Sequence, residues 1–200
     1  MIVEMKKKLI LASASPRRAA LLKQMGIEDF KVMSASVDET VFKRETPKMV
    51  VERLANAKAL KASEKHKDMF ILAADTVVSL GRRVLGKPES PEEAYEFLDL
   101  LSGNRHTVLT HLTLIRPDQK VINRLCQTRL KFKSLTEAEK KDYIKSKEWV
   151  DKAGGYAIQG EAAKFVPWIN GCYYNVMGLP IHEVYKLFLG NGFFNDMPSV

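Results

Sequence analysis

The chain has 200 residues and 46% hydrophobic side chains, which is enough to bury a sizeable core without disulfides or a structural metal. Its formal net charge of +8 favours an anionic partner, whether nucleic acid, anionic lipid or a small phosphorylated molecule. The two cysteines, Cys126 and Cys172, have neither paired spacing nor a neighbouring histidine, so the composition indicates no disulfide framework and no zinc site.

The N-terminal segment has some features of a secretion signal. Lys6, Lys7 and Lys8 precede an apolar run, but that run is too short for the hydrophobic part of a signal peptide. No stretch of the sequence is long and apolar enough to span a membrane. We therefore expect a cytoplasmic protein that binds no membrane, organised as a single domain over residues 1–200 without a separable linker. We expect a flexible tail at residues 190–200.

The first predicted elements are a strand over residues 9–11 and a helix that begins at Pro16 and ends near Gly26. Ser15 is a favourable N-cap residue, and proline is favoured at the first helical position. The loop that carries Ser13 is therefore expected at the carboxyl end of a strand and the amino end of a helix.

Arg17 and Arg18 occupy the first turn of this predicted helix, where the macrodipole favours acidic residues. Each cation there costs about 0.3–1 kcal/mol unless an anion offsets it. Backbone N–H groups, the hydroxyls of Ser13 and Ser15, and two guanidinium groups converging on one point would bind a phosphate or a carboxylate. The alternative is a pair of solvated surface arginines, and this stretch alone favours neither interpretation.

A short strand is predicted over residues 30–36, ending before Glu39, and a long helix from Pro47 to about residue 66. Lys58 interrupts an otherwise apolar stripe of that helix. Its ammonium either reaches solvent while the stem covers apolar surface, or it points into a polar cleft. The first is the more common fate of such a lysine.

An apolar run over residues 70–74 is typical of a buried strand and leads directly into Asp75 and Thr76. A buried carboxylate is costly unless a cation or hydrogen-bond donors meet it, so Asp75 is either functional or firmly paired. Glu39 is weaker evidence, because acidic residues in loops are usually solvated. If both carboxylates face one cleft, they would suit a hard cation such as Mg²⁺, which commonly binds one or two carboxylates together with substrate phosphates.

The rest of the chain mixes strands and helices without strict alternation. The predicted elements are a turn at 81–83, a strand at 84–85, a helix at 90–103, hairpin strands at 106–115 and 121–132, a helix at 136–145, strands at 165–169 and 173–177, and a helix at 179–189. This order predicts an α/β fold with a sizeable mixed sheet and two lobes around a cleft. Ligands of open α/β sheets bind beyond the carboxyl ends of strands, where Ser13 and Asp75 are expected.

Further polar groups lie in two loops. Lys87, in a rigid turn between a glycine and a proline, is either a phosphate ligand or an ordinary loop lysine. Residues 151–160 are rich in glycine, which permits close approach of the backbone to a ligand, with Lys152 and Gln159 as side-chain donors. No histidine lies beside a convincing nucleophile, so a serine or cysteine triad is not supported. The whole set is typical of metal-assisted attack on a phosphate.

Five short motifs follow one another along the chain: Ser13–Arg18 (SASPRR), Ala74–Thr76 (ADT), Gly86–Pro88 (GKP), Asp151–Gly160 (DKAGGYAIQG) and Asn175–Pro180 (NVMGLP). Their order and spacing resemble those of the Maf family of nucleoside triphosphate pyrophosphatases, from about Leu9 to Leu189. The resemblance implies an elongated mixed sheet flanked by helices, with two lobes around a central cleft, similar to inosine triphosphate pyrophosphatases. It also implies hydrolysis of a nucleoside triphosphate to the monophosphate and pyrophosphate with Mg²⁺ or Mn²⁺, and a link to septum formation.

The resemblance also implies roles for individual residues. The catalytic set is Asp75, Glu39, Lys58 and Lys87, with Asp75 as general base and Asp75 and Glu39 as the carboxylates of the metal site. The substrate-binding set is Ser13, Ser15, Arg17, Arg18, Thr76, Lys152 and Gln159, of which Arg18, Thr76 and Gln159 match positions linked to base choice. The form of residues 151–160 resembles the branch that prefers dTTP and UTP rather than 7-methyl-GTP. One departure is Cys172, where relatives more often carry serine, and it affects none of these residues.

Two other functions are compatible with the sequence. One is a basic nucleic-acid-binding or cell-division regulatory protein without catalysis, whose affinity would fall steeply with salt. That function leaves Asp75 unexplained. The other is a metal-dependent phosphatase, which would release orthophosphate instead of pyrophosphate. The resemblance also leaves a homodimer open.

Overall fold

Seven strands form one mixed sheet in this computed structural model, which describes residues 8–194. The strands are β1 (Leu9–Leu11), β2 (Lys31–Val32), β3 (Phe70–Leu80), β4 (Arg83–Leu85), β5 (Arg105–Ile115), β6 (Val121–Lys131) and β7 (Trp168–Asn170). Their order is β2-β1-β3-β5-β6-β7, with β4 paired to β3. β1 runs parallel to β2 and β3, and the remaining neighbours are antiparallel. The predicted α/β fold with a mixed sheet is confirmed.

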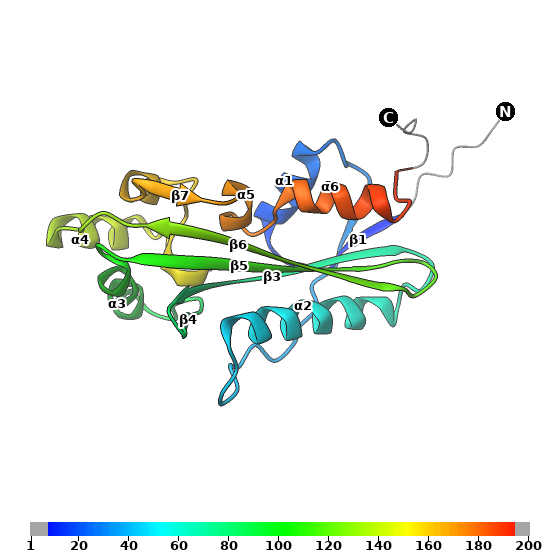
Figure 1. Cartoon of the computed structure of the whole chain (residues 1–200), viewed down its shortest axis with the longest axis horizontal. Helices are drawn as coiled ribbons and strands as arrows, with labels where there is room; N and C mark the ends of the chain where they lie inside the picture. The colour runs from blue at the N-terminus through cyan, green and yellow to red at the C-terminus, as the bar shows by residue number, and fades with distance from the viewer. Residues whose placement is uncertain (1–7, 195–200) are drawn as a thin grey trace.

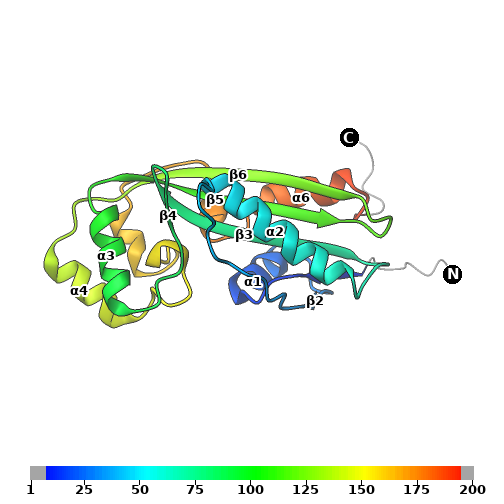
Figure 2. The ribbon, with the colours of Figure 1, turned by 90° about the horizontal axis from the view of Figure 1, so that it is seen from below.

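Helices cover both faces of the sheet (Figure 1). They are α1 (Pro16–Gln24), α2 (Pro47–Ser63), α3 (Pro91–Leu101), α4 (Glu137–Ser146), α5 (Tyr173–Val176) and α6 (Ile181–Gly190), with 3-10 turns η1 (Ala153–Gly155) and η2 (Glu161–Phe165). α1 and α6 lie on one face and α2 on the other, while α3 and α4 gather at one end of the long strands, as Figure 2 also shows. None of the helices within residues 8–194 is long and apolar enough to cross a membrane.

The starts of the helices follow the predicted capping residues. Side chains of three N-cap residues accept hydrogen bonds from the first helical turn, namely Thr46, Ser90 and Thr136. Each such cap stabilises its helix by about 1 kcal/mol. Helix α1 begins where predicted, but the Ser15 side chain makes no capping bond; instead its backbone N–H donates to Ser13 Oγ at 3.2 Å.

The hydrophobic core has two main centres that share the long strands. Between the sheet and the helices α1 and α6, the buried side chains include Leu22, Leu72 and Phe188. At the other end, near α3 and α4, they include Phe132 and Tyr143. Since β3 and β5 contribute buried residues to both centres, the sheet itself joins the two ends of the molecule.

Two predicted strands are shorter than expected. The strand predicted at residues 30–36 is limited to Lys31–Val32, because it lies at the sheet edge and pairs only with the three-residue β1. Glu39 therefore lies in a loop and not at the end of a strand. The strand predicted at residues 165–169 begins only at Trp168, since η2 extends to Phe165 and residues 166–167 connect it to β7.

Residues 173–177 were predicted to be a strand, but Tyr173–Val176 form helix α5. Gly171, with a φ of 125°, turns the chain sharply at this point, and a Cβ there would lie 2.8 Å from Thr128 Oγ1. The helical turn places the fully buried Asn175 so that its amide donates to Val108 O and Thr128 Oγ1. Tertiary hydrogen bonds thus override the local strand preference.

The end of the chain is better packed than predicted. The Phe193 ring lies 5.3 Å from the Phe70 ring and 4.3 Å from the Phe188 ring, measured between centroids. Apolar contacts thus place Phe193 against the core, and the flexibility of the segment from residue 190 stays a prediction. Residues 1–7 and 195–200 lie outside the described part of the chain.

Candidate active site

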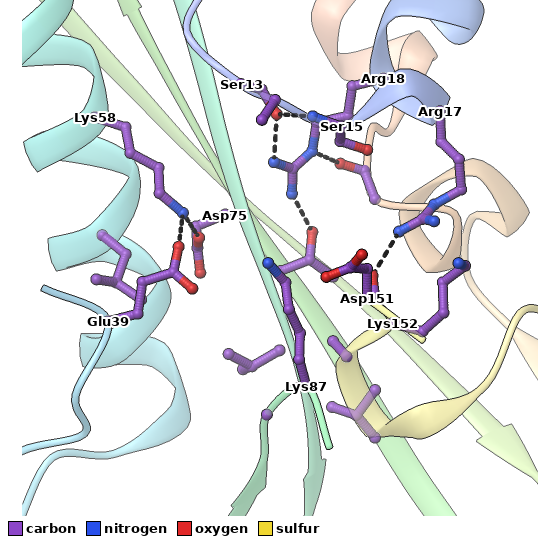
Figure 3. Close-up of a pocket in the computed structure, with 18 of the residues that line it drawn as sticks. Ser13, Ser15, Arg17, Arg18, Glu39, Lys58, Asp75, Lys87, Asp151 and Lys152 are labelled. Atoms are coloured by element: carbon purple, nitrogen blue, oxygen red, sulfur yellow. Dashed lines mark hydrogen bonds and ion pairs between the residues drawn. The ribbon is translucent and has the colours of Figure 1, made fainter. Parts of the chain in front are cut away.

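A cavity of about 660 Å³ opens between α2, the β1–α1 loop and the segment around η1. Its wall collects side chains from segments that are far apart in the sequence (Figure 3). The candidate residues predicted from the sequence all line it: Ser13, Ser15, Arg17, Arg18, Glu39, Lys58, Asp75, Thr76, Lys87, Lys152 and Gln159. The fold therefore brings together every group that sequence reasoning singled out.

Lys58 reaches from α2 into the cavity and bridges two carboxylates (Figure 3). Its Nζ lies 2.5 Å from Asp75 Oδ1 and 2.7 Å from Glu39 Oε1. Of the two fates considered for Lys58, the structure shows the less common one, with the ammonium in a polar cleft. Asp75 is 7% exposed, so it is both buried and paired.

The two carboxylates differ in basicity. Burial raises the pKa of Asp75 above its ordinary value, because the ionised form loses hydration, and the charges of Lys58 and Arg18 oppose this without cancelling it. Burial also acts on Glu39, but the hydrogen bond from Lys58 and nearby cationic side chains outweigh it and hold the pKa of Glu39 below its ordinary value. Asp75 is therefore the group suited to accept a proton, while Glu39 stays ionised.

The guanidinium of Arg18 binds three neutral oxygens. Its Nε donates to Gly178 O at 2.8 Å. Its Nη1 donates to Ser13 Oγ at 3.0 Å and its Nη2 to Thr76 Oγ1 at 3.1 Å. Burial lowers the pKa of Arg18, and the charge of Asp75 opposes this shift. Arg18 thus ties together the β1–α1 loop, β3 and the segment after α5.

Arg17 points in a different direction. Its Nη2 donates to Asp151 O at 3.2 Å, and Figure 3 shows its guanidinium beside Lys152. Burial and the neighbouring charge of Arg17 lower the pKa of Lys152, whose Nζ donates to Val150 O at 2.8 Å. Both arginines line the same cavity, but their hydrogen-bond partners differ: Arg18 binds oxygens of the β1–α1 loop, of β3 and of the segment after α5, and Arg17 binds Asp151 O. That both guanidinium groups bind one anion stays a prediction.

Lys87 extends into the cavity from the turn after β4 (Figure 3). Within residues 8–194 it forms no ion pair, although its charge is near enough to lower the pKa of Glu39. Ser15 and Gln159 line the same cavity, and their side chains form no hydrogen bond within that range. A cation without a counter-ion in a cavity lined by further cations favours an anionic ligand.

Asp75 and Glu39 are the candidate ligands of a metal ion. In the part of the chain that the structure describes, no three His, Cys, Asp or Glu side chains are grouped as a metal site. Lys58 contacts one oxygen of each carboxylate, which leaves the second oxygen of each outside these ion pairs. Because Mg²⁺ commonly binds one or two carboxylates and completes its shell with water and substrate phosphate, this donor set fits a metal that binds together with a phosphate ligand.

Some contributors to the site escaped sequence reasoning. The carbonyl oxygens of Gly178 and Asp151 bind the two arginines, and no sequence signal distinguishes one carbonyl from another.

The glycine-rich segment at residues 151–160 was predicted to allow close approach of the backbone to a ligand, but one of its glycines serves packing. A Cβ on Gly154, which has a φ of 70°, would lie 2.7 Å from a methyl carbon of Val78, so this glycine allows packing against β3.

The fold and the cavity define a class of protein: a mixed α/β protein whose site combines a buried, basic carboxylate with cationic side chains that suit a polyanion. The chain belongs to the Maf family, since the family model described as Maf-like protein matches residues 8–190. The family resemblance of the five sequence motifs is therefore confirmed.

Individual relatives match over nearly the whole chain. A protein named dTTP/UTP pyrophosphatase from Chelativorans sp. (strain BNC1) is 49% identical over 192 residues, covering 93% of this chain and 92% of that protein. A protein of the same name from Agrobacterium fabrum is 45% identical over 194 residues, covering 94% of each. Among solved structures, the Staphylococcus aureus Ham1 protein aligns over 63% of this chain and 72% of its own, with 17% identity and a TM-score of 0.46.

Proposed function

We propose that this chain is a nucleoside triphosphate pyrophosphatase that hydrolyses dTTP, UTP and modified pyrimidine nucleotides to the monophosphate and pyrophosphate. The buried pair of Asp75 and Lys58 in a cavity lined by cations carries the proposal, because it supplies a base and compensating charge for a polyanionic substrate. The base preference is supported by the relatives named dTTP/UTP pyrophosphatase, at 45–49% identity.

In the proposed reaction, Asp75 accepts a proton from a water molecule while the water oxygen attacks the α phosphorus. The bond from that phosphorus to the oxygen bridging the α and β phosphates breaks, and pyrophosphate leaves with the bridging oxygen. The water oxygen remains on the monophosphate, and the proton held by Asp75 returns to solvent. Lys58 orients the carboxylate through its 2.5 Å contact with Oδ1.

Charge on the departing pyrophosphate is stabilised by side chains that the cavity already holds. Arg17, Lys58 and Lys87 approach it from the β1–α1 loop, from α2 and from the turn after β4. Cationic groups fixed in advance stabilise developing negative charge without reorganising, and such contacts are commonly the largest contribution to catalysis. Arg18, bound to three neutral oxygens, chiefly shapes the wall of the site.

A divalent cation completes the proposed site. Asp75 and Glu39 would hold Mg²⁺ or Mn²⁺, and the bound metal would neutralise phosphate charge and orient the substrate. Glu39 is suited to this use because its pKa lies below the ordinary value, so it stays ionised when the solution is mildly acidic.

A product assay with the purified protein tests the proposal. Each common nucleoside triphosphate, with pyrimidine analogues, is incubated with Mg²⁺, Mn²⁺ or EDTA, and pyrophosphate and orthophosphate are measured separately. Pyrophosphate released from dTTP and UTP supports the proposed reaction. Orthophosphate as the primary product would instead identify a phosphatase, and no turnover of any triphosphate would refute both activities.

Other expectations from the sequence are tested independently. Weak binding of duplex DNA and RNA, measured at several salt concentrations, would support the prediction that nucleic acid is not the partner. A homodimer, which the resemblance leaves open, would have a mass near twice 22.6 kDa in light scattering. Imaging of cells that carry the tagged chain tests the expected cytoplasmic location. Imaging of cells from which the chain is deleted tests the expected link to septum formation.

A further inference from the structure

Two hydrogen-bond routes start at Arg18 and end at the backbone carbonyl of Asn175. In one, Arg18 Nε donates to Gly178 O, and the Gly178 N–H donates to Asn175 O at 3.0 Å. In the other, Arg18 Nη2 donates to Thr76 Oγ1, which lies 2.9 Å from Thr110 Oγ1. The Thr110 hydroxyl in turn donates to Asn175 O at 3.2 Å. A closed ring of hydrogen bonds therefore supports this wall of the cavity.

The direction of the second route follows from the chemistry of its two ends. A guanidinium has only donors, and a carbonyl oxygen has only lone pairs. Thr110 must therefore donate its single hydroxyl proton to Asn175 O. The Thr76 hydroxyl, which accepts from Arg18, must donate its own proton to Thr110. The Thr76 proton is thus used inside the wall and is not available to a bound molecule.

The hydroxyl on the other side of Arg18 has the opposite polarity. Ser13 Oγ accepts from Arg18 Nη1 at 3.0 Å and from the backbone N–H of Ser15 at 3.2 Å. Both of its lone pairs are then occupied, so its proton remains free to be donated. Of these two hydroxyls in the cavity wall, Ser13 offers a donor, whereas Thr76 offers at most a lone pair.

Asn175 anchors the far end of the chain of hydroxyls. It is fully buried, and its side-chain amide donates to Val108 O at 3.1 Å and to Thr128 Oγ1 at 3.0 Å. Thr110 is fully buried as well. Neither residue lines the cavity, so neither contacts a ligand there directly.

We propose that Thr110 and Asn175 are positioning residues. They fix the Thr76 hydroxyl so that it donates its proton to Thr110. Toward a substrate, the Thr76 hydroxyl can then act only as a hydrogen-bond acceptor. Resting on the proposed function, this assigns Thr76 to a substrate N–H. The N3 atom of thymine and uracil carries a proton, whereas the N3 atom of cytosine has only a lone pair. The arrangement therefore accepts the first two bases and opposes cytosine, because a site built to bind one hydrogen-bond polarity rejects the reverse.

Substitution of Thr110 tests the proposal without touching the cavity wall. Thr110→Val keeps the side-chain shape but removes the acceptor for the Thr76 proton, which becomes free to turn toward substrate. The ratio of kcat/KM for dTTP over dCTP should fall about 5–10-fold, the effect of one neutral hydrogen bond. Thr110→Ser restores the hydroxyl and should restore the ratio.

Thr113→Val on the same strand is the matched control. Thr113 is also fully buried, and its hydroxyl oxygen lies 2.9 Å from Asn56 Oδ1 and 3.1 Å from Asn123 Oδ1, so its partners are other than Thr76. This variant should lose stability but keep the dTTP/dCTP ratio. An unchanged ratio in Thr110→Val, or an equal change in Thr113→Val, would overturn the proposal.

A measurement without turnover separates this inference from the proposed function. In the NMR spectrum of the whole chain, the Thr76 hydroxyl proton should exchange slowly with water, and Thr110→Val should abolish this protection. Rapid exchange in the unsubstituted protein would overturn the proposed direction of the hydrogen bonds. If neither dTTP nor UTP is hydrolysed while the protection is present, the proposed function fails and the positioning role stands.

Discussion

Lys58 Nζ lies 2.5 Å from Asp75 Oδ1, and the same ammonium lies 2.7 Å from Glu39 Oε1. One helix thus supplies the counter-charge for a buried carboxylate on the central strand β3. This ion pair compensates the negative charge of Asp75 in the absence of substrate, while burial still raises the pKa of Asp75. The pair therefore explains how a buried carboxylate is tolerated, and the raised pKa suits the proposed role of Asp75 as a base.

Asp75→Asn should abolish most catalysis and leave the fold intact. The amide has nearly the same volume but cannot accept a proton from water, and loss of a general base commonly costs about 10²–10⁴ in rate. Lys58 would keep its bond to Glu39. Pyrophosphate release from dTTP measures the rate, and circular dichroism checks the fold. Near-normal release would remove Asp75 from the proposed chemistry.

Lys58→Met should shift the acidic limb of the pH–rate profile to higher pH. Lys58 lowers the pKa of Asp75 through its charge and its hydrogen bond, and burial raises it. Without the Lys58 ammonium, the pKa of Asp75 should therefore be higher. A base with a higher pKa is protonated, and so inactive, at a higher pH. The measurement is kcat/KM for dTTP between about pH 4 and 9.

Lys61→Met is the control for the shift of the acidic limb. Lys61 lies one turn further along α2, donates to Ser36 O at 2.5 Å and does not line the cavity. Its substitution should leave the acidic limb in place. An identical limb in the wild-type protein and in Lys58→Met would contradict the coupling between Lys58 and Asp75.

Glu39→Gln should raise the concentration of Mg²⁺ or Mn²⁺ needed for half-maximal activity. An amide keeps the shape of the side chain but removes the negative charge that favours a hard cation. We expect an increase of about tenfold, in the range found for weakened metal sites. Asp38→Asn is the control, since Asp38 lies outside the cavity and accepts from the backbone of Thr40. Equal metal dependence in both variants would argue against Glu39 as a ligand.

Arg18→Lys and Arg17→Lys should have unequal effects on stability. Lysine cannot reproduce the three bonds of Arg18 to Ser13, Thr76 and Gly178, so the melting temperature should fall by about 5–10 °C. Arg17 donates a single exposed bond to Asp151 O, and its substitution should change the melting temperature by less than about 2 °C. Equal shifts in a thermal melt would contradict the structural role of Arg18.

Acid should destabilise the fold through His106. This side chain is 2% exposed, bonds Tyr156 Oη at 2.8 Å, and burial lowers its pKa to about 4. The unfolded chain binds a proton near pH 6.5 and the folded chain only near pH 4, so stability falls as the pH drops through this window. The loss is at most roughly 3 kcal/mol.

His106→Gln removes the titrating group and keeps a polar partner for Tyr156. Urea unfolding at pH 7 and pH 4.5 measures the difference for each protein. The buried Asp75 contributes to the pH dependence of both, so its effect cancels in the comparison. The difference should be smaller in His106→Gln, and equal differences would show that His106 does not control acid stability.

Much of the fold could be predicted from local sequence. Capping residues marked the starts of α2, α3 and α4, and the apolar run before Asp75 marked the central strand, because caps and burial depend on residues close in sequence. The predictions were wrong where tertiary contacts dominate. Residues 173–177 were predicted to be a strand, but Tyr173–Val176 form helix α5 around the buried Asn175.

The sequence by itself determined which groups are available at the site: a carboxylate after a buried strand, a lysine on an apolar helix face, and arginines at a helix start. These residues stand out in the sequence because each one violates a local preference. Only the tertiary structure decided their partners. It paired Asp75 with Lys58, gave Arg18 and Arg17 different hydrogen-bond partners, and joined Thr76 to Asn175 through Thr110. The physical reason is that hydrogen bonds and ion pairs depend on distances of about 3 Å between residues remote in sequence, which only the packed fold defines.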